Sequence, residues 1–349
     1  MHSRVNQINP GTMVDSFFEA VLFLQGEITY SERFGFLDDG FDIAGTIAAL
    51  DRSLVYSTLV GIFPWIHPYL YTVMEKIPGT GAAGRTYLMQ FVQKKIEERG
   101  RNRKQGDRAM GVPLDDASPR DFLDKMSDAH EKDPDKVTKY HIFMMGLSNI
   151  IAGSDTTAVS LSSVVYHLMT SPECLLKLRQ EINDHGCRQR RLSYKELVEM
   201  PYLQAVIKEA LRLHPATGLP LWRVVPEGGM QLGDHWLPAG TNVGLNSWVA
   251  HYNKRIFGQD AHMFRPERWE QTRVEDSERY KLMEAHYMPF GLGSRTCIGR
   301  HISTLEMAKL IPDLVKAFDF TLDMPQEEWK TVNYWFVKPE RFPVRLERL

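Results

Sequence analysis

Cysteine is scarce in this chain, which has only three among its 349 residues: Cys174, Cys187 and Cys297. An odd and widely spaced set without a Cys-x-x-Cys pair argues against a disulfide framework, a zinc ribbon or a thioredoxin-type redox centre. The scarcity therefore excludes the small disulfide-rich secreted folds and favours a reducing compartment.

Long apolar runs and an excess of one charge are also missing. No stretch approaches the roughly 18 uninterrupted apolar residues that a membrane helix needs, and residues 1–13 hold no signal core. The chain has 42 basic and 44 acidic residues, and 43% of it is hydrophobic. This composition is typical of a globular protein with a large core. We expect no membrane span in this chain and no nucleic-acid partner.

The first two thirds of the sequence carry apolar residues at three- and four-residue spacing, which predicts helices. The expected helices cover residues 13–24, 41–60, 85–100, 118–129, 137–170, 171–184, 193–199 and 201–214, with Gly100 as a C-cap. Alternating patches at 221–225 and 241–246, a last helix from Cys297 to Phe318, and runs at 319–323 and 331–347 follow. The prediction is one mainly α domain over residues 1–349, helix-rich to residue 215 and mixed with a small β component from 216 to 349.

The segment GTGAAG (79–84) matches the Gly-x-Gly-x-x-Gly pattern of dinucleotide-binding sites. Such a site must follow a buried strand, and an acidic residue must end the next strand. The preceding residues show no strand alternation and end in proline, and a single charged helix follows. We interpret the segment as a turn between helices, and a nicotinamide-dependent dehydrogenase stays a weaker alternative.

The segment AGSDTT (152–157) places five poor helix formers in the centre of the most apolar helix. Their polar groups would be buried and would need partners or water. One interpretation is a kinked structural helix. The other is a site at which Gly153 lets a planar ligand approach the backbone, with a polar break that lets Asp155 and Thr156 relay protons.

The segment KEALRLHP (208–215) puts Glu209 and Arg212 three residues apart, on one helix face. Such pairs usually lie in solvent, but the surrounding residues are apolar enough to bury this helix. A buried arginine needs several acceptors. The sequence therefore favours a structural ion cluster over a catalytic pair.

The segment PFGLGSRTCIGR (289–300) sets Cys297 in a glycine-rich turn before a helix. Exposed backbone N–H groups, a helix N-terminus and nearby Arg295 would all favour thiolate over thiol. No sequence neighbour supplies a histidine base, and no cysteine-nucleophile signature matches. Either Cys297 is a buried structural cysteine, or it is an axial metal ligand that faces a flat cofactor, with Gly299 keeping the next turn narrow.

At these residues the sequence resembles the cytochromes P450, the haem-thiolate monooxygenases. The segment 290–299 fits their haem-binding signature, AGSDTT resembles their oxygen-activation segment, EALR their Glu-x-x-Arg, and FRPERW (264–269) the segment that adds Arg268 to that pair. These motifs run from about residue 137 to the end of the chain. The segment EITYSERFGFLDDG (27–40) resembles fungal secondary-metabolism members similar to pisatin demethylase.

The resemblance implies the P450 fold, with a long helix crossing haem b, and a role for each matching residue. Cys297 would be the thiolate ligand of the iron, shielded by Phe290 in a loop shaped by Gly293 and Gly299. Arg295 and Arg223 would pair with the haem propionates. Ala152 and Gly153 would border the oxygen site, where Thr156 would hold the activated oxygen and a water while Asp155 delivers protons. Glu209, Arg212 and Arg268 would stabilise the core behind the haem loop.

The resemblance also implies partners and a location. The substrates would be O2 and a small lipophilic metabolite that contacts residues 216–221, and an NADPH-dependent reductase would donate electrons. Relatives begin with a membrane anchor and lie on the cytosolic face of the endoplasmic reticulum. Neither the anchor nor the first strands are found here, so we expect an N-terminally truncated chain. The alternative is a haem-free, non-catalytic homologue.

Overall fold

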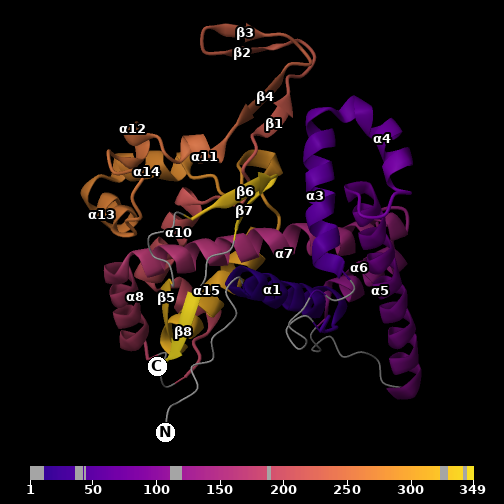
Figure 1. The fold of residues 1–349 in the computed structure, drawn as a ribbon, viewed down its shortest axis with the longest axis horizontal. Helices are drawn as coiled ribbons and strands as arrows, with labels where there is room; N and C mark the ends of the chain where they lie inside the picture. The colour runs from indigo at the N-terminus through magenta and orange to yellow at the C-terminus, as the bar shows by residue number, and fades with distance from the viewer. Residues whose placement is uncertain are drawn as a thin grey trace. The chain divides into compact units, whose positions relative to one another are not determined.

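The computed structural model describes residues 12–35, 42, 45–110, 120–186, 190–322, 329–340 and 344–349. The chain forms two compact units, one built on Asp15–Ala158 and the other on Val159–Leu349. The boundary falls inside helix α7 (Lys139–Thr170), which continues through it without interruption (Figure 1). The expected long helix at 137–170 is thus confirmed, and the fold is mainly α.

All the regular elements among the described residues of the unit at Asp15–Ala158 are helices. Besides the first part of α7, its elements are α1 (Thr12–Tyr30), α3 (Thr46–Ile62), the 3₁₀ turn η2 (Pro64–Ile66), α4 (His67–Met74), α5 (Gly81–Met110) and α6 (Phe122–Lys132). Helix α6 begins where the Asp121 side chain accepts a hydrogen bond from the Asp124 amide at 2.7 Å. That is the side-chain N-cap that aspartate favours.

The GTGAAG segment is a turn between α4 and α5, as expected, and its glycines have a packing function. Gly79 has a φ of +84° in the turn. A Cβ on Gly81 would lie 2.2 Å from the Arg52 carbonyl oxygen, and one on Gly84 would lie 2.7 Å from the Ala49 carbonyl oxygen. The two glycines therefore let α5 lie directly against the backbone of α3, and among the described residues no strand precedes them to build a dinucleotide site.

Gly100 does not end its helix, which corrects the prediction for residues 85–100. Helix α5 continues to Met110, and Gly100 does not have the positive φ of a C-cap glycine. A single glycine in a helix interior costs only about 1 kcal/mol. The helix tolerates that cost, because residues 101–110 contain no proline that would stop it.

The helices of the unit at Val159–Leu349 surround α10 (Pro201–Leu213), which packs on α8, α13 and α15. The others are α8 (Pro172–Asp184), α9 (Tyr194–Val198), α11 (Ser247–Ala250), α12 (Lys254–Phe257), α13 (Glu267–Glu275), α14 (Ser277–His286), the turn η3 (Gly293–Arg295) and α15 (Arg300–Ala317). The last helix was expected to begin at Cys297, but it begins three residues later, with Gly299 at its N-cap.

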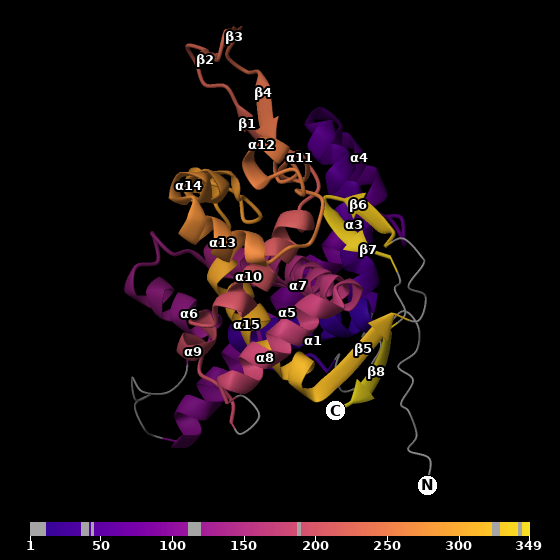
Figure 2. The same ribbon diagram turned by 90° about the vertical axis from the view of Figure 1, so that its left-hand side faces the viewer.

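The strands of this unit form four antiparallel pairs among its described residues. They are β1 (Leu221–Val224) with β4 (Asn242–Leu245), β2 (Met230–Leu232) with β3 (His235–Leu237), β5 (Phe318–Leu322) with β8 (Val344–Arg348), and β6 (Thr331–Tyr334) with β7 (Phe336–Pro339). In both views the β2–β3 hairpin extends from the end of the β1–β4 pair (Figures 1 and 2). The strand-like run at 331–347 is thus three strands.

Helices α3 and α4 expose an unusually apolar surface. No Asp, Glu, Lys or Arg occurs from Ser53 to Met74. The exposed side chains in and beside this stretch include Leu59, Ile62, Phe63, Trp65, Tyr69 and Val73, with Trp65 at 71% and Tyr69 at 76% exposure. Among the described helices none alone has the length and hydropathy to cross a membrane, but α3 with η2–α4, bent by 113°, meets those criteria as a pair.

Candidate functional site

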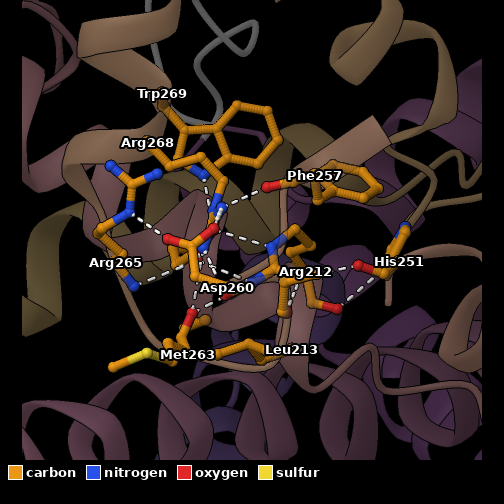
Figure 3. Close-up of polar contacts among 12 residues, drawn as sticks. Arg212, Leu213, His251, Phe257, Asp260, Met263, Arg265, Arg268 and Trp269 are labelled. Carbon is orange, nitrogen blue, oxygen red and sulfur yellow. Dashed lines mark hydrogen bonds and ion pairs between the residues drawn. The ribbon is translucent and has the colours of Figure 1, made fainter. Parts of the chain in front are cut away.

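The Glu209 carboxylate is the centre of a buried ion cluster. Figure 3 labels Arg212, Arg268 and Trp269, which belong to this cluster. The Oε1 of Glu209 accepts hydrogen bonds from Arg212 Nη2 at 2.8 Å and Arg268 Nε at 3.1 Å, and its Oε2 accepts from Arg212 Nε at 2.9 Å. All three side chains are almost completely buried, at 0%, 0% and 1% exposure. The structure thus brings together the three residues that the sequence assigned to a structural cluster.

The remaining donors of both arginines are satisfied by backbone carbonyls. Arg212 Nη1 donates to the carbonyls of His251 and Ala261, both at 2.7 Å. Arg268 donates to the Phe257 and Asp260 carbonyls and to the Asp260 carboxylate. Burial alone would raise the pKa of Asp260, but the hydrogen bonds and charges of Arg268 and Arg265 lower it to about 2. The cluster therefore fixes the loop 258–263 as well as the helices.

Two members of this cluster were missed by the sequence reasoning. Trp269 Nε1 donates to Glu209 Oε2 at 2.9 Å, and the Arg265 amide donates to Glu209 Oε1 at 3.2 Å. Lys208 lies over the Trp269 ring, with Nζ 4.2 Å from the ring centroid, and pairs with Glu284. The available signal was the indole next to Arg268 in FRPERW, because a buried Trp N–H requires an acceptor.

Cys297 lies in a loop that closes on itself. The Cys297 amide donates to the Phe290 carbonyl at 2.8 Å, and the Gly291 amide donates to the Met288 carbonyl at 3.0 Å. Gly291 and Gly293 have φ values of +70° and +68°, which only glycine adopts readily. At Gly299 a Cβ would meet only the Cys297 Sγ, at 3.8 Å, so this glycine is not required by crowding in the structure.

The Cys297 thiol is exposed, which contradicts the interpretation of a buried structural cysteine. It lies beside exposed Ile298, at 98% exposure, and the same loop exposes Leu292. The other described thiol, Cys174, is buried, and Cys187 lies outside the described residues. A thiol displayed among apolar side chains suits a ligand for a flat apolar group better than it suits a packing role.

Two predicted propionate partners lie in the same unit as this thiol. Leu221, at the start of β1, lies beside the loop, because a Cβ on Gly291 would be 3.7 Å from Leu221 Cδ1. Arg223 is two residues further along β1, so it shares the strand face of Leu221. Arg223 and Arg295 are both exposed, and neither forms an ion pair within the described part of the chain. Phe290 is half-buried in the loop.

The AGSDTT segment lies at the end of the Asp15–Ala158 unit. Helix α7 continues through it without a break. Thr156 Oγ1 donates back to the Ala152 carbonyl at 2.8 Å, and Ser154 Oγ donates to the Ile150 carbonyl. These i to i−4 bonds satisfy the hydroxyls of Ser154 and Thr156 inside the helix, so the helix continues without the polar break that one interpretation expected. Ala152 is exposed and Thr156 half-buried, one turn apart on the same face, whereas Asp155 is buried.

Gly153 has a packing partner that sequence reasoning did not find. A Cβ at this position would lie 2.8 Å from the amide group of Gln25, which is a buried residue of α1 in the same unit. The missing side chain therefore gives room to Gln25. Its assignment to a planar ligand stays a prediction beside this packing reason.

The predicted substrate segment, residues 216–221, runs along the β6–β7 pair. The Val337 amide donates to the Ala216 carbonyl, and the Gly218 amide donates to the Trp335 carbonyl, both at 2.9 Å. Ala216 and Gly218 are buried, whereas Thr217, Leu219, Pro220 and Leu221 are half-buried. The half-buried side chains are the ones that remain accessible to a ligand.

Comparison with known proteins decides the family. The family model described as Cytochrome P450 matches residues 1–343. The chain belongs to the cytochrome P450 family. The match reaches further towards the N-terminus than the motifs that carried the resemblance. The P450 fold and the expected likeness to the pisatin demethylase group are thereby confirmed.

The relatives of this P450 are fungal monooxygenases. It is 37% identical to the cytochrome P450 monooxygenase cicH of Emericella nidulans over 93% of this chain and 63% of that protein. It is 39% identical to a pisatin demethylase of Fusarium vanettenii over 90% of this chain and 59% of that protein. With the monooxygenase ACRTS1 of Alternaria alternata it shares 33% identity over 93% of this chain and 84% of that protein. The chain thus spans about 60% of the length of the first two relatives.

Solved structures agree with the fold. The crystal structure of the cytochrome P450 CYP102L1 matches with a TM-score of 0.76 and 25% identity, over 99% of this chain and 70% of that chain. The cytochrome P450DA heme domain matches with a TM-score of 0.78, over 99% of this chain and 69% of that chain. At 20% identity the second likeness concerns the fold alone.

The residues present around Cys297 fit the haem that the family implies. The donor set is one exposed thiol, which is the ligand type that P450 haem iron takes. Exposed apolar side chains of the same loop, Leu292 and Ile298, suit the porphyrin ring. Arg223 and Arg295 suit its two carboxylates, because neither arginine forms an ion pair among the described residues.

Proposed function

We propose that this chain acts as a haem-dependent monooxygenase that inserts one oxygen atom from O2 into a small lipophilic metabolite. The observation that carries the proposal is the exposed Cys297 thiol in a glycine loop of a P450 fold. A buried structural cysteine would gain stability from packing, whereas this one exposes its reactive atom.

The loop residues would bind and orient the cofactor. A thiolate-ligated haem supplies an iron that binds O2 and favours cleavage of its O–O bond. Cys297 would bind the iron through Sγ, and Phe290 would exclude water from the sulfur. Arg295 and Arg223 would each hold a propionate by charge-assisted hydrogen bonds. Gly293 has open space where a Cβ would lie, and the absence of a side chain there leaves this space free beside the loop.

The α7 residues would handle protons at the oxygen site. Thr156 Oγ1 uses its own proton in the bond to the Ala152 carbonyl, so it would hold a water at the oxygen site by accepting a hydrogen bond from it. Asp155 would deliver protons, and its burial suits a relay that is kept away from bulk solvent. Ala152 and Gly153 would leave room beside the helix.

The substrate class and electron source follow from the family. Hydroxylation, epoxidation and demethylation share this machinery, and the relatives named above are monooxygenases and a demethylase. The half-buried side chains of 217 and 219–221 are mostly apolar, which favours a lipophilic substrate. Electrons would come from NADPH through a separate reductase.

We also propose a location at the cytosolic face of the endoplasmic reticulum membrane. The exposed apolar side chains between Ser53 and Met74, a stretch without Asp, Glu, Lys or Arg, support contact with a bilayer, because soluble proteins rarely expose a large apolar patch. Exposed Trp65 and Tyr69 have the side chains that prefer the interface between hydrocarbon and water.

The second candidate is a haem-free homologue without catalysis. Both candidates share every motif, and only haem occupancy separates them.

The test is the carbon monoxide difference spectrum of the reduced protein, expressed with a haem precursor. We expect the red-shifted Soret band of thiolate-ligated haem, its loss in Cys297→Ser, and its retention in the matched control Cys174→Ser, which removes a buried thiol. Absence of haem in the wild-type protein would favour the second candidate. A thiolate band that persists in Cys297→Ser would refute the ligand assignment.

A further inference from the structure

His251 connects the ion cluster to the beginning of the cysteine loop. It follows α11 and is completely buried. Its Nδ1 lies 2.9 Å from the Arg212 carbonyl oxygen, and its own carbonyl accepts from Arg212 Nη1 at 2.7 Å. The Met288 amide donates to the other ring nitrogen, Nε2, at 2.9 Å. Figure 3 shows the ring of His251 beside Arg212.

The bond from Met288 determines the tautomer of the ring. A backbone N–H can only donate, so Nε2 must be the unprotonated nitrogen and Nδ1 must carry the hydrogen. Nδ1 can then donate to the Arg212 carbonyl. The imidazole is neutral in this arrangement, and burial, partly offset by the Arg212 carbonyl, lowers the pKa of His251 to about 4.

Aromatic neighbours hold this ring in position. Tyr287, the residue before Met288, stacks on His251 with ring centroids 5.8 Å apart and planes at 19°. Phe257 meets the ring by its edge, at 6.1 Å and 78°. Both neighbours restrict rotation of the imidazole. The acceptor nitrogen is therefore directed at Met288.

Met288 in turn begins the loop that carries Cys297. Its carbonyl accepts from the Gly291 amide at 3.0 Å, and two residues later the Phe290 carbonyl accepts from the Cys297 amide at 2.8 Å. A short hydrogen-bonded path therefore runs from Arg212 through His251 and Met288 to the loop.

We propose that His251 is a positioning residue for the cysteine loop, acting through the acceptor Nε2 on the Met288 amide. The inference deepens the proposed function, since the loop is the one that would hold haem. If His251 only filled the core, the order of the cysteine loop would be the same whichever of the two ring nitrogens kept its hydrogen bond.

Two amide variants separate the two nitrogens. In His251→Gln the side-chain oxygen reaches the place of Nε2 and can accept from Met288, whereas the donor to Arg212 is lost. In His251→Asn the side-chain nitrogen replaces Nδ1 and keeps the donor, whereas the acceptor is lost. Both variants remove the buried imidazole ring and lose its packing contacts, so a difference between them reports the hydrogen bonds.

The experiment is limited trypsin digestion of the haem-free protein, followed by mass spectrometry. Arg295 is exposed in the loop, and exposed Lys195 on α9 reports general opening. We expect trypsin to cut His251→Asn after Arg295 at least fivefold faster than it cuts His251→Gln there. Cleavage after Lys195 should proceed at the same rate in both variants. Equal rates for both variants after Arg295, or equal acceleration at Lys195, would overturn the proposal.

Two further measurements keep the proposal falsifiable if either variant fails to fold. Nitrogen NMR of the wild-type protein should show His251 as the neutral tautomer with the proton on Nδ1 at pH 7, and a proton on Nε2 would refute it. In haem-loaded protein His251→Asn should lose more of the thiolate band than His251→Gln. A wild-type chain without haem would count against the proposed function but leave the digestion and NMR results valid.

Discussion

At the scale of single residues, Glu209 shows how a buried charge is stabilised here. The two carboxylate oxygens of Glu209 accept five hydrogen bonds: three from arginine side chains, one from the Trp269 indole and one from the Arg265 amide. Removing one partner of a buried charge costs more than the bond itself, since the remaining group has lost its hydration. Each donor is therefore expected to matter for stability.

Trp269→Phe tests the donor that the sequence did not reveal. The ring and its contact with Lys208 would remain, but Glu209 Oε2 would keep a single donor. We expect the free energy of unfolding to fall by about 1–3 kcal/mol, measured by urea denaturation. The matched control Trp236→Phe changes a tryptophan on β3 that is 61% exposed and should have little effect. Equal losses in both variants would contradict this account.

The sequence predicted part of this cluster for identifiable reasons. Glu209 and Arg212 lie one turn apart, and the apolar residues around them indicated burial. Trp269 and His251 meet the cluster across 60 and 39 residues of chain. No local spacing encodes such contacts, because they depend on how the helices and loops pack. Likewise, the exposure of Cys297 could not be derived from its neighbours in sequence.

At the scale of elements, two glycines of α5 that look alike in sequence have opposite environments. Gly84 lies against the α3 backbone, whereas Gly100 is helical and has open space where a methyl group would lie. We expect Gly84→Ala to destabilise the protein, because its Cβ would lie 2.7 Å from the Ala49 carbonyl oxygen. Gly100→Ala should stabilise it by about 0.5–1 kcal/mol through helix propensity.

Thermal and urea denaturation of the two glycine variants would measure both effects. The paired design controls for the change of residue type, since each variant adds one methyl group to the same helix. Destabilisation by Gly100→Ala would show that α5 does not continue past this position. A neutral Gly84→Ala would refute the close packing of α3 and α5.

The apolar surface of α3 and α4 gives a prediction about membrane contact. Trp65→Ser combined with Tyr69→Ser should lower the binding of the protein to phosphatidylcholine vesicles at least fivefold, measured by co-sedimentation, because both rings are exposed. The control pair is Leu232→Ser with Trp236→Ser on the β2–β3 hairpin, which is also exposed. If the control pair lowers binding equally, the bilayer contact does not belong to α3 and α4.

The sequence predicted three helices well, but it ended α1 six residues early and α5 ten residues early, and it missed several short elements. The bounds expected for α7, α8 and α10 agree with the structure within two residues. Helices α11, α12 and α14 were missed, and each begins at an Asn or Asp side-chain cap: Asn246, Asn253 and Asp276. They are four to ten residues long, so apolar periodicity cannot identify them.

At the scale of the whole molecule, buried histidines make stability depend on pH. Burial lowers the pKa of His167 to about 3, with the charges of His214 and Arg212 adding to the effect, and it lowers the pKa of His214 and His251 to about 4. The unfolded chain has an ordinary histidine pKa near 6.5 and so binds these protons more readily. Acid therefore favours unfolding.

The expected stability is full above about pH 6.5 and falls progressively as the pH drops towards 4. Urea denaturation at pH 7, 6 and 5 would show a midpoint that decreases at each step. Asp260, with its pKa lowered to about 2, loses its contribution only below about pH 4, so the histidines act in a separate window. A midpoint that stays constant between pH 7 and 5 would contradict neutral burial of these rings.

The pairing of the strands bears on how the chain folds during synthesis. Every described ladder joins residues at most thirty positions apart, as in Phe318 with Arg348, and the two hairpins join residues at most seven and eight positions apart. Closing such short loops costs little entropy, and low contact order is associated with fast folding. Each ladder can therefore form as soon as its own stretch leaves the ribosome, without waiting for a distant strand.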